Sequence, residues 1–224
     1  MKVMLLAAGR GERMRPLTDQ IPKPLLPVAG KPLVAWHLER LARAGFREIV
    51  INVSWLGDQI IEALGDGSGY GVQISWSREP WPALETGGGL FNALPLLGDA
   101  PFLLVNSDVY TDIDFASLRI APDDLAQLVL VPNPAHHLQG DFWLNANGRI
   151  VNEGGDRLTY SGISLLRPGL FAGAHPGRFP LLPWLLQALA AGRLGGQKHA
   201  GRWLDIGTPE RLHELDAELA SVRR

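Results

Sequence analysis

Near its start the chain carries the stretch LLAAGRGERMRPLT (residues 5–18), in which a short apolar strand runs into a glycine-rich loop. Glycines let backbone N–H groups approach an anion closely, because no side chain stands in the way. Arg10, Arg13 and Arg15 add positive charge, and Lys23 follows shortly after them. The stretch therefore predicts a polyphosphate-binding loop at the edge of a sheet, with these cations directed at the anion.

The spacing within this loop separates it from two common phosphate-binding motifs. It lacks the G-x-x-x-x-G-K-[ST] pattern of a P-loop, and Met14 stands where a dinucleotide fingerprint has its third glycine. The chain has instead G-x-G-x-R-x-x-P-x-T, followed by P-K-P. This string resembles the sugar-1-phosphate nucleotidyltransferase family, in which the loop and the lysine bind a nucleoside triphosphate.

Composition limits the class of protein. The chain has 224 residues, of which 46% are hydrophobic, and its formal net charge is −2. These values fit one globular domain and give no basic field that would attract nucleic acid. The absence of cysteine excludes disulfides and thiolate metal sites. The apolar run 3–8 is too short for a signal peptide, and no run approaches the ~20 residues of a membrane span. We expect a cytoplasmic protein without membrane attachment.

Strand and helix signals alternate along the first half. This pattern predicts an α/β fold with a Rossmann-like, mostly parallel central sheet and helices on both faces. The predicted strands are 2–8, 46–53, 72–76 and 101–106, and the predicted helices are 32–44, 57–64 and 86–97, the last with Thr86 as N-cap. The less regular second half predicts strands at 125–131 and 160–166, a hairpin at 142–151, helices at 182–191 and 209–222, and an extended segment at 201–204.

We expect a single nucleotidyltransferase domain over residues 1–224. The resemblance divides it into a nucleotide-binding half (1–110) and a sugar-binding half (111–224). The second half is expected to form a small sugar-binding lobe on the same sheet.

Two aspartates follow strand signals in distant parts of the chain. Asp108 comes after FLLVNS (102–107), and Asp205 lies in WLDIGTP (203–209), which matches the family's W-x-D-[IV]-G-T-P motif. A carboxylate at the carboxyl end of a parallel strand lies at the ligand-binding edge of an α/β sheet. Mg²⁺ is typically held by one or two carboxylates plus substrate phosphates. We therefore predict that Asp108 and Asp205 hold Mg²⁺, and we interpret the pair at 136–137, HH, as a surface turn.

The resemblance implies roles for the other residues of the cleft. Arg13 and Lys23 are expected to be catalytic, Arg13 on the leaving phosphates and Lys23 at the α-phosphate or the sugar phosphate. A segment at 85–89, ETGGG, resembles the family's base-contacting segment, although its glycines fit a packing role equally well. The implied nucleotide-binding residues are Ala8, Gly9, Gly11, Glu12, Arg13, Glu79, Thr86 and Gly87.

The sugar site is implied by a glycine after a strand, a glutamate and an S-x-G-type segment. The family's E-K-P lysine is absent, because the chain reads EGGD at residues 153–156. The two glycines fit either room for a bulkier sugar substituent or an ordinary loop. Asn52, at the end of a predicted strand, is a further candidate for the cleft. The implied sugar-binding residues are Asn106, Gly140, Asp141, Glu153, Ser161 and Gly162.

The resemblance implies transfer of a nucleotidyl group from a nucleoside triphosphate to a sugar 1-phosphate, with release of pyrophosphate. The short build and the EGG segment favour UTP and N-acetylmuramate 1-phosphate, a substrate of peptidoglycan recycling. GTP with mannose 1-phosphate is the alternative. A nicotinamide-dependent oxidoreductase would need a third glycine at position 14, and a non-catalytic nucleotide sensor would not need Arg13, Lys23, Asp108 and Asp205 together. We expect a monomer or a weak dimer.

Overall fold

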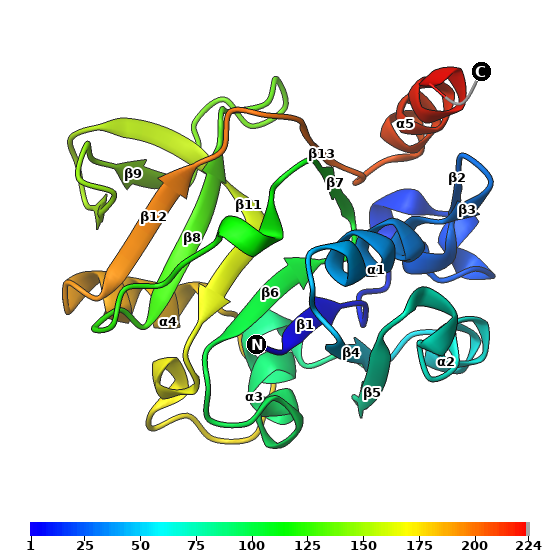
Figure 1. The fold of residues 1–224 in the computed structure, drawn as a ribbon, viewed down its shortest axis with the longest axis horizontal. Coiled ribbons are helices and arrows are strands. Elements are labelled where there is room, and N and C mark those ends of the chain that lie inside the picture. Colours follow the sequence, from blue (N-terminus) through cyan, green and yellow to red (C-terminus); the bar gives the residue numbers. More distant parts are fainter. Residues whose placement is uncertain (223–224) are drawn as a thin grey trace.

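The computed structural model describes residues 1–222, and a nine-stranded mixed sheet forms the centre of this region (Figure 1). Its first-half strands run parallel to one another, and β1 lies between β4 and β6. In spatial order these strands are β6 (Phe102–Asn106), β1 (Val3–Leu6), β4 (Glu48–Val53) and β5 (Gln73–Arg78). The residues of β6, β1 and β4 are mostly apolar, so these strands can be covered on both faces, whereas the edge strand β5 is largely polar.

The second half of the chain extends the same sheet. β11 runs antiparallel to β6 and joins the two halves edge to edge. The predicted hairpin is confirmed as β9 and β10, whereas the parallel strand β12 was not predicted, because its sequence LGGQK has no apolar run. The strands of this half are β8 (Ala126–Val131), β9 (Phe142–Leu144), β10 (Ile150–Val151), β11 (Asp156–Leu166) and β12 (Leu194–Lys198).

Helices cover both faces of the sheet. Val3 and Leu5 of β1 pack with α1 (Leu33–Arg43) and α2 (Gly57–Leu64). Met4, which points to the other face, packs in the cluster that contains residues of α3 (Glu85–Leu97) and α4 (Leu182–Ala190). This alternation confirms the predicted α/β class with a mostly parallel central sheet.

The end of the described chain returns to its beginning. In Figure 1 the red helix α5 (Pro209–Val222) lies beside the blue β2–β3 hairpin (Pro27–Val28 and Lys31–Pro32). Leu215 and Leu219 of α5 share a buried cluster with Met14 of the glycine-rich loop. Nearby, β7 (Val109–Thr111) pairs antiparallel with β13 (Trp203–Asp205). This pairing sets the Asp205 segment beside the residue that follows Asp108.

One predicted helix cap is wrong, and short 3₁₀ helices occupy several of the connecting segments. α3 begins at Glu85 after Leu84, so Thr86 lies inside the helix instead of capping it. Short 3₁₀ helices occupy Glu12–Met14, Leu17–Asp19, Lys23–Leu25, Ser68–Tyr70, Phe115–Ser117 and Pro168–Phe171. Within residues 1–222, no helix is both long and apolar enough to cross a membrane.

Candidate functional site

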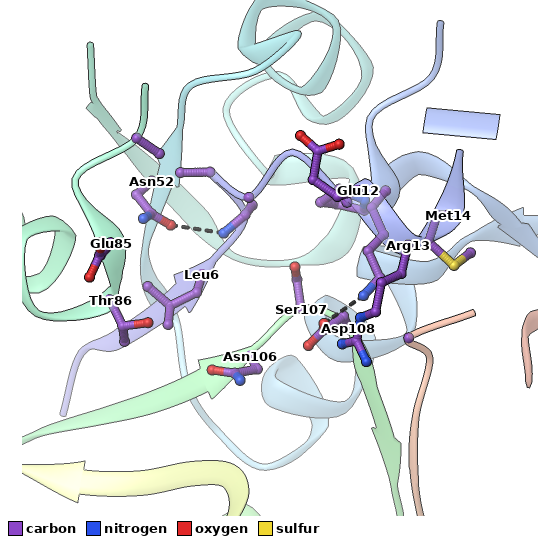
Figure 2. A pocket seen from close by; sticks show the side chains of 18 of the residues that line it. Leu6, Glu12, Arg13, Met14, Asn52, Glu85, Thr86, Asn106, Ser107 and Asp108 are labelled. Atoms are coloured by element: carbon purple, nitrogen blue, oxygen red, sulfur yellow. Dashed lines mark hydrogen bonds and ion pairs between the residues drawn. The ribbon is translucent and has the colours of Figure 1, made fainter. Parts of the chain in front are cut away.

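The carboxyl ends of three parallel strands form one wall of a cavity of about 370 Å³, which we name the strand-end cavity (Figure 2). Leu6 of β1 pairs with Asn52 of β4 on one side and with Asn106 of β6 on the other. Asn52 Oδ1 accepts a hydrogen bond from Ala7 N at 2.8 Å, which holds the start of the loop against the next strand. The cavity thus lies where ligands bind in open α/β sheets.

Most of the predicted nucleotide-binding residues line this cavity. Figure 2 shows Arg13 and Asp108 on one side of it, with Asn52, Glu85 and Thr86 on the other. The lining residues are Leu6, Ala7, Ala8, Gly9, Gly11, Glu12, Arg13, Met14, Lys23, Pro24, Asn52, Glu79, Ala83, Glu85, Thr86, Asn106, Ser107, Asp108 and Gly207.

Two glycines of the loop serve different purposes. Gly11 has φ +68°, and an added Cβ would lie 3.0 Å from Thr18 Cγ2 and 3.3 Å from Lys23 Cβ, so both conformation and space require glycine. At Gly9 an added Cβ would meet nothing within 4 Å. Since Gly9 lines the cavity, its lack of a side chain leaves open space where a ligand can approach the backbone.

The cations of the loop are divided between two tasks. The prediction that all of them serve the anion is wrong for Arg10 and Arg15, because both pair with Asp19. Arg10 also donates to Thr18 O and stacks over Trp55 at 4.0 Å from the ring centroid. Arg13, by contrast, lines the cavity. Arg10 and Arg15 therefore stabilise the loop, and Arg13 is left to face a ligand.

Lys23 and Asp108 meet in the cavity. Lys23 Nζ donates to Asp108 Oδ2 at 2.6 Å, and their side chains are 12% and 36% exposed. The pair joins the loop to the end of β6 across 85 residues of sequence. It places a cation and a carboxylate together at the edge of the sheet, where phosphate charge can be neutralised.

Asp205 lies next to this pair but does not line the cavity. Ile206 N donates to Asp108 O at 2.7 Å, so the two aspartate segments are joined through their backbones. Asp205 itself pairs with Arg211 of α5 and with His136 Nε2 at 3.0 Å. A Cβ built on the intervening Gly207 would lie 3.2 Å from both Arg13 Nη2 and Asp205 Oδ2. The tertiary structure therefore brings both predicted metal ligands to one region.

The donor set fits a hard divalent cation that is completed by substrate. Among residues 1–222 no group of three or more His, Cys, Asp or Glu side chains could form an all-protein metal site. Mg²⁺ characteristically takes only one or two carboxylates and completes its octahedron with water and phosphate oxygens. Asp108 and Asp205, each balanced by a cation, match that requirement.

A buried histidine lies behind the cavity. His37 of α1 is 2% exposed, and this burial lowers its pKa to about 4, with a smaller opposing effect from the Val109 backbone. The imidazole is therefore neutral at neutral pH. It lies close enough to Asp108 for that carboxylate to influence its pKa.

Glu79 lines the cavity, but its carboxylate is already engaged. Oε1 accepts from Asn52 Nδ2 at 2.7 Å, and Oε2 accepts from Leu84 N at 2.8 Å. These bonds tie the loop before α3 to the end of β4. The geometry thus assigns Glu79 a supporting position in the wall, and its predicted contact with the nucleotide stays a prediction.

The glycines that open α3 are required by packing. An added Cβ at Gly87 would lie 2.6 Å from Phe179 Cδ2 and from Pro180 O, and Gly87 does not line the cavity. Gly88 is likewise covered by Gly177 O, while its N donates to Phe179 O at 3.0 Å. These contacts favour the packing interpretation of the segment.

A second cavity of about 500 Å³, the α4 cavity, adjoins the first through Thr86 and Asn106. Gly140 and Asp141, both predicted to bind sugar, lie in its wall. Burial raises the pKa of Tyr160 to about 12, so this residue presents a neutral phenol. The lining residues are Thr86, Leu104, Asn106, Gly140, Asp141, Phe142, Arg157, Tyr160, Pro180, Leu181, Leu182 and Leu185.

The remaining predicted sugar-binding residues lie outside this lining. Ser161 is fully buried, and its hydroxyl donates to Val129 O at 2.7 Å. Gly162 has φ +78°, and a Cβ there would lie 2.7 Å from Asn106 Nδ2, so it leaves space for that side chain. Glu153 is exposed in the turn before β11. Burial and packing explain the first two, and their predicted contacts with a sugar stay predictions.

Sequence reasoning missed several residues near the site. Arg211 and His136 reach Asp205 from α5 and from the turn before β9, and no local motif marks them. Leu185 was predicted only as part of the helix at 182–191, and Leu181 lies just before that helix. Helical spacing does not show which part of a helix borders a cavity.

Comparison with known proteins now identifies the family. Residues 2–138 match the family model "Nucleotidyl transferase". The chain belongs to the nucleotidyl transferase family. It is 56% identical to the N-acetylmuramate alpha-1-phosphate uridylyltransferase of Neisseria meningitidis serogroup B, with 97% of each chain covered. It is 34% identical to the protein of the same name from Caulobacter vibrioides, with 98% of this chain and 97% of that one covered.

Solved structures share the fold. A putative glucose-1-phosphate thymidylyltransferase from Bacillus anthracis, crystallised with sucrose, superposes with a TM-score of 0.84 at 22% identity, over 98% of this chain and 95% of that one. HddC from Yersinia pseudotuberculosis, complexed with GMP-PN, gives a TM-score of 0.78 at 23% identity, over 97% and 99%. These neighbours support the α/β class. The nucleotidyl transferase family generally uses a divalent metal.

Proposed function

We propose that this nucleotidyltransferase transfers UMP from UTP to N-acetylmuramate α-1-phosphate, giving a UDP-sugar and pyrophosphate. The observation that carries the proposal is the junction of two cavities at Thr86 and Asn106, with the Lys23–Asp108 pair in the first. One cavity offers backbone and cations for a triphosphate, and the other offers room for a sugar. Two relatives that match over nearly the whole length of both proteins carry the corresponding name.

The reaction needs charge neutralisation more than proton transfer. A sugar phosphate has a second pKa near ~6 and is therefore largely dianionic at neutral pH, so no general base is required. The obstacle is the approach of one anion to another. We propose that Arg13 holds the departing β- and γ-phosphates and that Lys23 stabilises charge at the α-phosphate, since both line the strand-end cavity. Positioning and fixed charge then supply the catalysis, in line and without a covalent enzyme intermediate.

We propose Mg²⁺ as the divalent cation, held by Asp108 and Asp205. When bound, it would neutralise phosphate charge and help to align the two substrates. The pairing of Asp108 with Lys23, and of Asp205 with Arg211, holds both carboxylates in place. The chain supplies the remaining positive charge through Arg13 and Lys23.

Three further predictions belong to this proposal. Residues 1–224 form one catalytic domain, in which 1–110 bind the nucleotide and 111–224 bind the sugar. The protein acts in the cytoplasm. It is a monomer or a weak dimer, which light scattering coupled to size-exclusion chromatography would measure.

The second candidate is a mannose-1-phosphate guanylyltransferase. The enzyme of that name from Mycobacterium tuberculosis is 31% identical over 96% of this chain, but the match spans 64% of its own length. The lower identity and the partial coverage favour the uridylyltransferase. The lining of the strand-end cavity does not by itself distinguish the two nucleotides.

A pyrophosphate-release assay with each nucleoside triphosphate and a panel of sugar 1-phosphates tests the proposal. We expect the highest kcat/KM with UTP and N-acetylmuramate α-1-phosphate. A preference for GTP and mannose 1-phosphate would support the second candidate. No release with any pair, in the presence of Mg²⁺ and with nucleotide binding intact, would indicate a non-catalytic sensor.

A further inference from the structure

The lining of the α4 cavity is mostly apolar. Its floor is apolar, since Leu104, Leu181 and Leu185 are each at most 6% exposed. Leu182, at 51% exposure, carries this apolar surface outward. Sugar hydroxyls gain nothing from such walls, whereas methyl groups do. The cavity therefore fits a sugar that bears apolar substituents.

Arg157 is the cationic residue among those that line this cavity in the described region. Within residues 1–222 its guanidinium has no carboxylate partner, and it lies 5.7 Å from the ring centroid of Trp143, on the neighbouring strand. The acid in this lining, Asp141, has both oxygens engaged: Oδ1 lies 2.9 Å from His137 Nε2, and Oδ2 accepts from Tyr160 N at 2.7 Å. Among the described residues, Arg157 is therefore a cation of this lining that makes no ion pair, while the carboxylate of Asp141 is engaged by other groups.

From this arrangement we infer that Arg157 binds the carboxylate of the substrate's lactyl group and so determines which sugar phosphate is used. The inference rests on the proposed function. N-acetylmuramate differs from N-acetylglucosamine by a lactyl ether on the sugar ring, which carries one carboxylate and one methyl group. The guanidinium matches the carboxylate in charge and in planar geometry, and the leucine side chains match the methyl.

This role of Arg157 would explain how the protein selects one sugar 1-phosphate over another while the residues that act on the phosphates stay the same. Lys23 and Asp108 act on phosphates that every sugar 1-phosphate shares, so they cannot tell one sugar from another. Arg157 lies in the other cavity and meets only what projects from the ring. Trp143 lies alongside it, and its ring face limits the freedom of the guanidinium. Arg157 is therefore a specificity-determining residue, and its effect depends on the substituent.

The test compares two substrates in one variant. In Arg157→Gln we expect kcat/KM for N-acetylmuramate α-1-phosphate to fall by roughly 10- to 100-fold, as for loss of a charge-assisted hydrogen bond. With N-acetylglucosamine 1-phosphate, which lacks the lactyl ether, we expect a change of less than about threefold. Arg157→Lys keeps the charge without the planar guanidinium, so its kcat/KM for N-acetylmuramate α-1-phosphate should lie between those of the wild type and of Arg157→Gln. Arg43→Gln, an exposed arginine on α1, is the matched control.

Calorimetric titration of the products gives a second readout that needs no turnover. UDP-N-acetylmuramate should lose affinity for the Gln variant, and UDP-N-acetylglucosamine should not. An equal loss for both ligands would overturn the inference by showing that Arg157 acts on the ring or the fold, and no loss for either would overturn it as well. If the wild-type protein fails to use N-acetylmuramate α-1-phosphate at all, the proposed function itself fails, and the inference fails with it.

Discussion

The two adjoining cavities differ in how the chain builds them. The strand-end cavity draws most of its lining from one continuous loop and from the ends of neighbouring strands. The α4 cavity collects residues scattered between Thr86 and Leu185. The first is lined by several charged side chains, while the second is mostly apolar, with one arginine and one aspartate in its lining. If the proposed roles hold, the reacting phosphates meet a mostly local motif, whereas the sugar meets a surface that only tertiary packing assembles.

Substitution of Lys23 should have the largest effect on turnover. We expect Lys23→Ala to lower kcat by roughly 10²–10³, as for removal of one donor that stabilises developing charge. Because Lys23 lies at the phosphate end, the loss should be the same for every sugar phosphate used, unlike that of Arg157→Gln. Steady-state kinetics with two sugar phosphates measures it, with Lys2→Ala as control. Turnover like that of the wild type would remove Lys23 from the mechanism.

The buried histidine behind the strand-end cavity should make stability depend on pH. In the unfolded chain His37 takes up a proton below its ordinary pKa of 6.5, but in the folded protein only below about 4. The contribution of neutral His37 to the free energy of unfolding is therefore fully present above pH 6.5 and is lost as the pH falls toward 4. For this one group the loss at pH 5 is about 2 kcal/mol.

Urea unfolding of the wild type and of His37→Leu at pH 7 and pH 5 measures this effect. The variant should lose less stability between these two pH values, because it has no proton to take up. Tyr160 of the α4 cavity does not contribute to this pH dependence, because burial raises its pKa to about 12. Equal pH dependence in both proteins would show that His37 is not the group responsible.

The carboxylates should control the metal requirement. In Asp108→Asn and in Asp205→Asn we expect the Mg²⁺ concentration for half-maximal activity to rise by about tenfold or more. Each change removes the charge that would hold the cation, while the amide keeps the shape of the side chain. Asp58→Asn, an 87% exposed aspartate on α2, is the control. A metal titration that stays unchanged in both variants would exclude these two ligands.

The two glycines of the loop should respond differently to the same substitution. Gly11→Ala forces a side chain into the left-handed region and toward Thr18, which should cost about 1–2 kcal/mol. Gly9→Ala meets no protein atoms and should leave the melting temperature unchanged, but its methyl group should raise KM for UTP severalfold. Thermal unfolding and nucleotide kinetics of the two variants separate the roles. A similar loss of stability in both would contradict this distinction.

The fold class and the phosphate end of the site could be predicted from the sequence because their signals are local. The apolar strand, the glycines and the cations of the loop are neighbours in the chain, and their spacing alone indicates a turn that faces an anion. Asp108 could be placed because a strand's end fixes the edge of the sheet on which the next residue lies. Helix and strand limits were mostly correct to within a few residues, since periodicity carries that information.

The sequence could not show which charges face the cavity or what surrounds the sugar. Arg10 and Arg13 are close neighbours of the same type, and only the position of Asp19 and Trp55 in space turns Arg10 away. Arg157 becomes part of a site only because α4 packs beneath the sheet at that point. The local order of residues in the glycine-rich loop determined that a phosphate-binding type of loop would form. The folded structure decided which side chains remain available to bind, because the partner of a charge can be near in sequence, as Asp19 is for Arg10, or distant, as Asp108 is for Lys23.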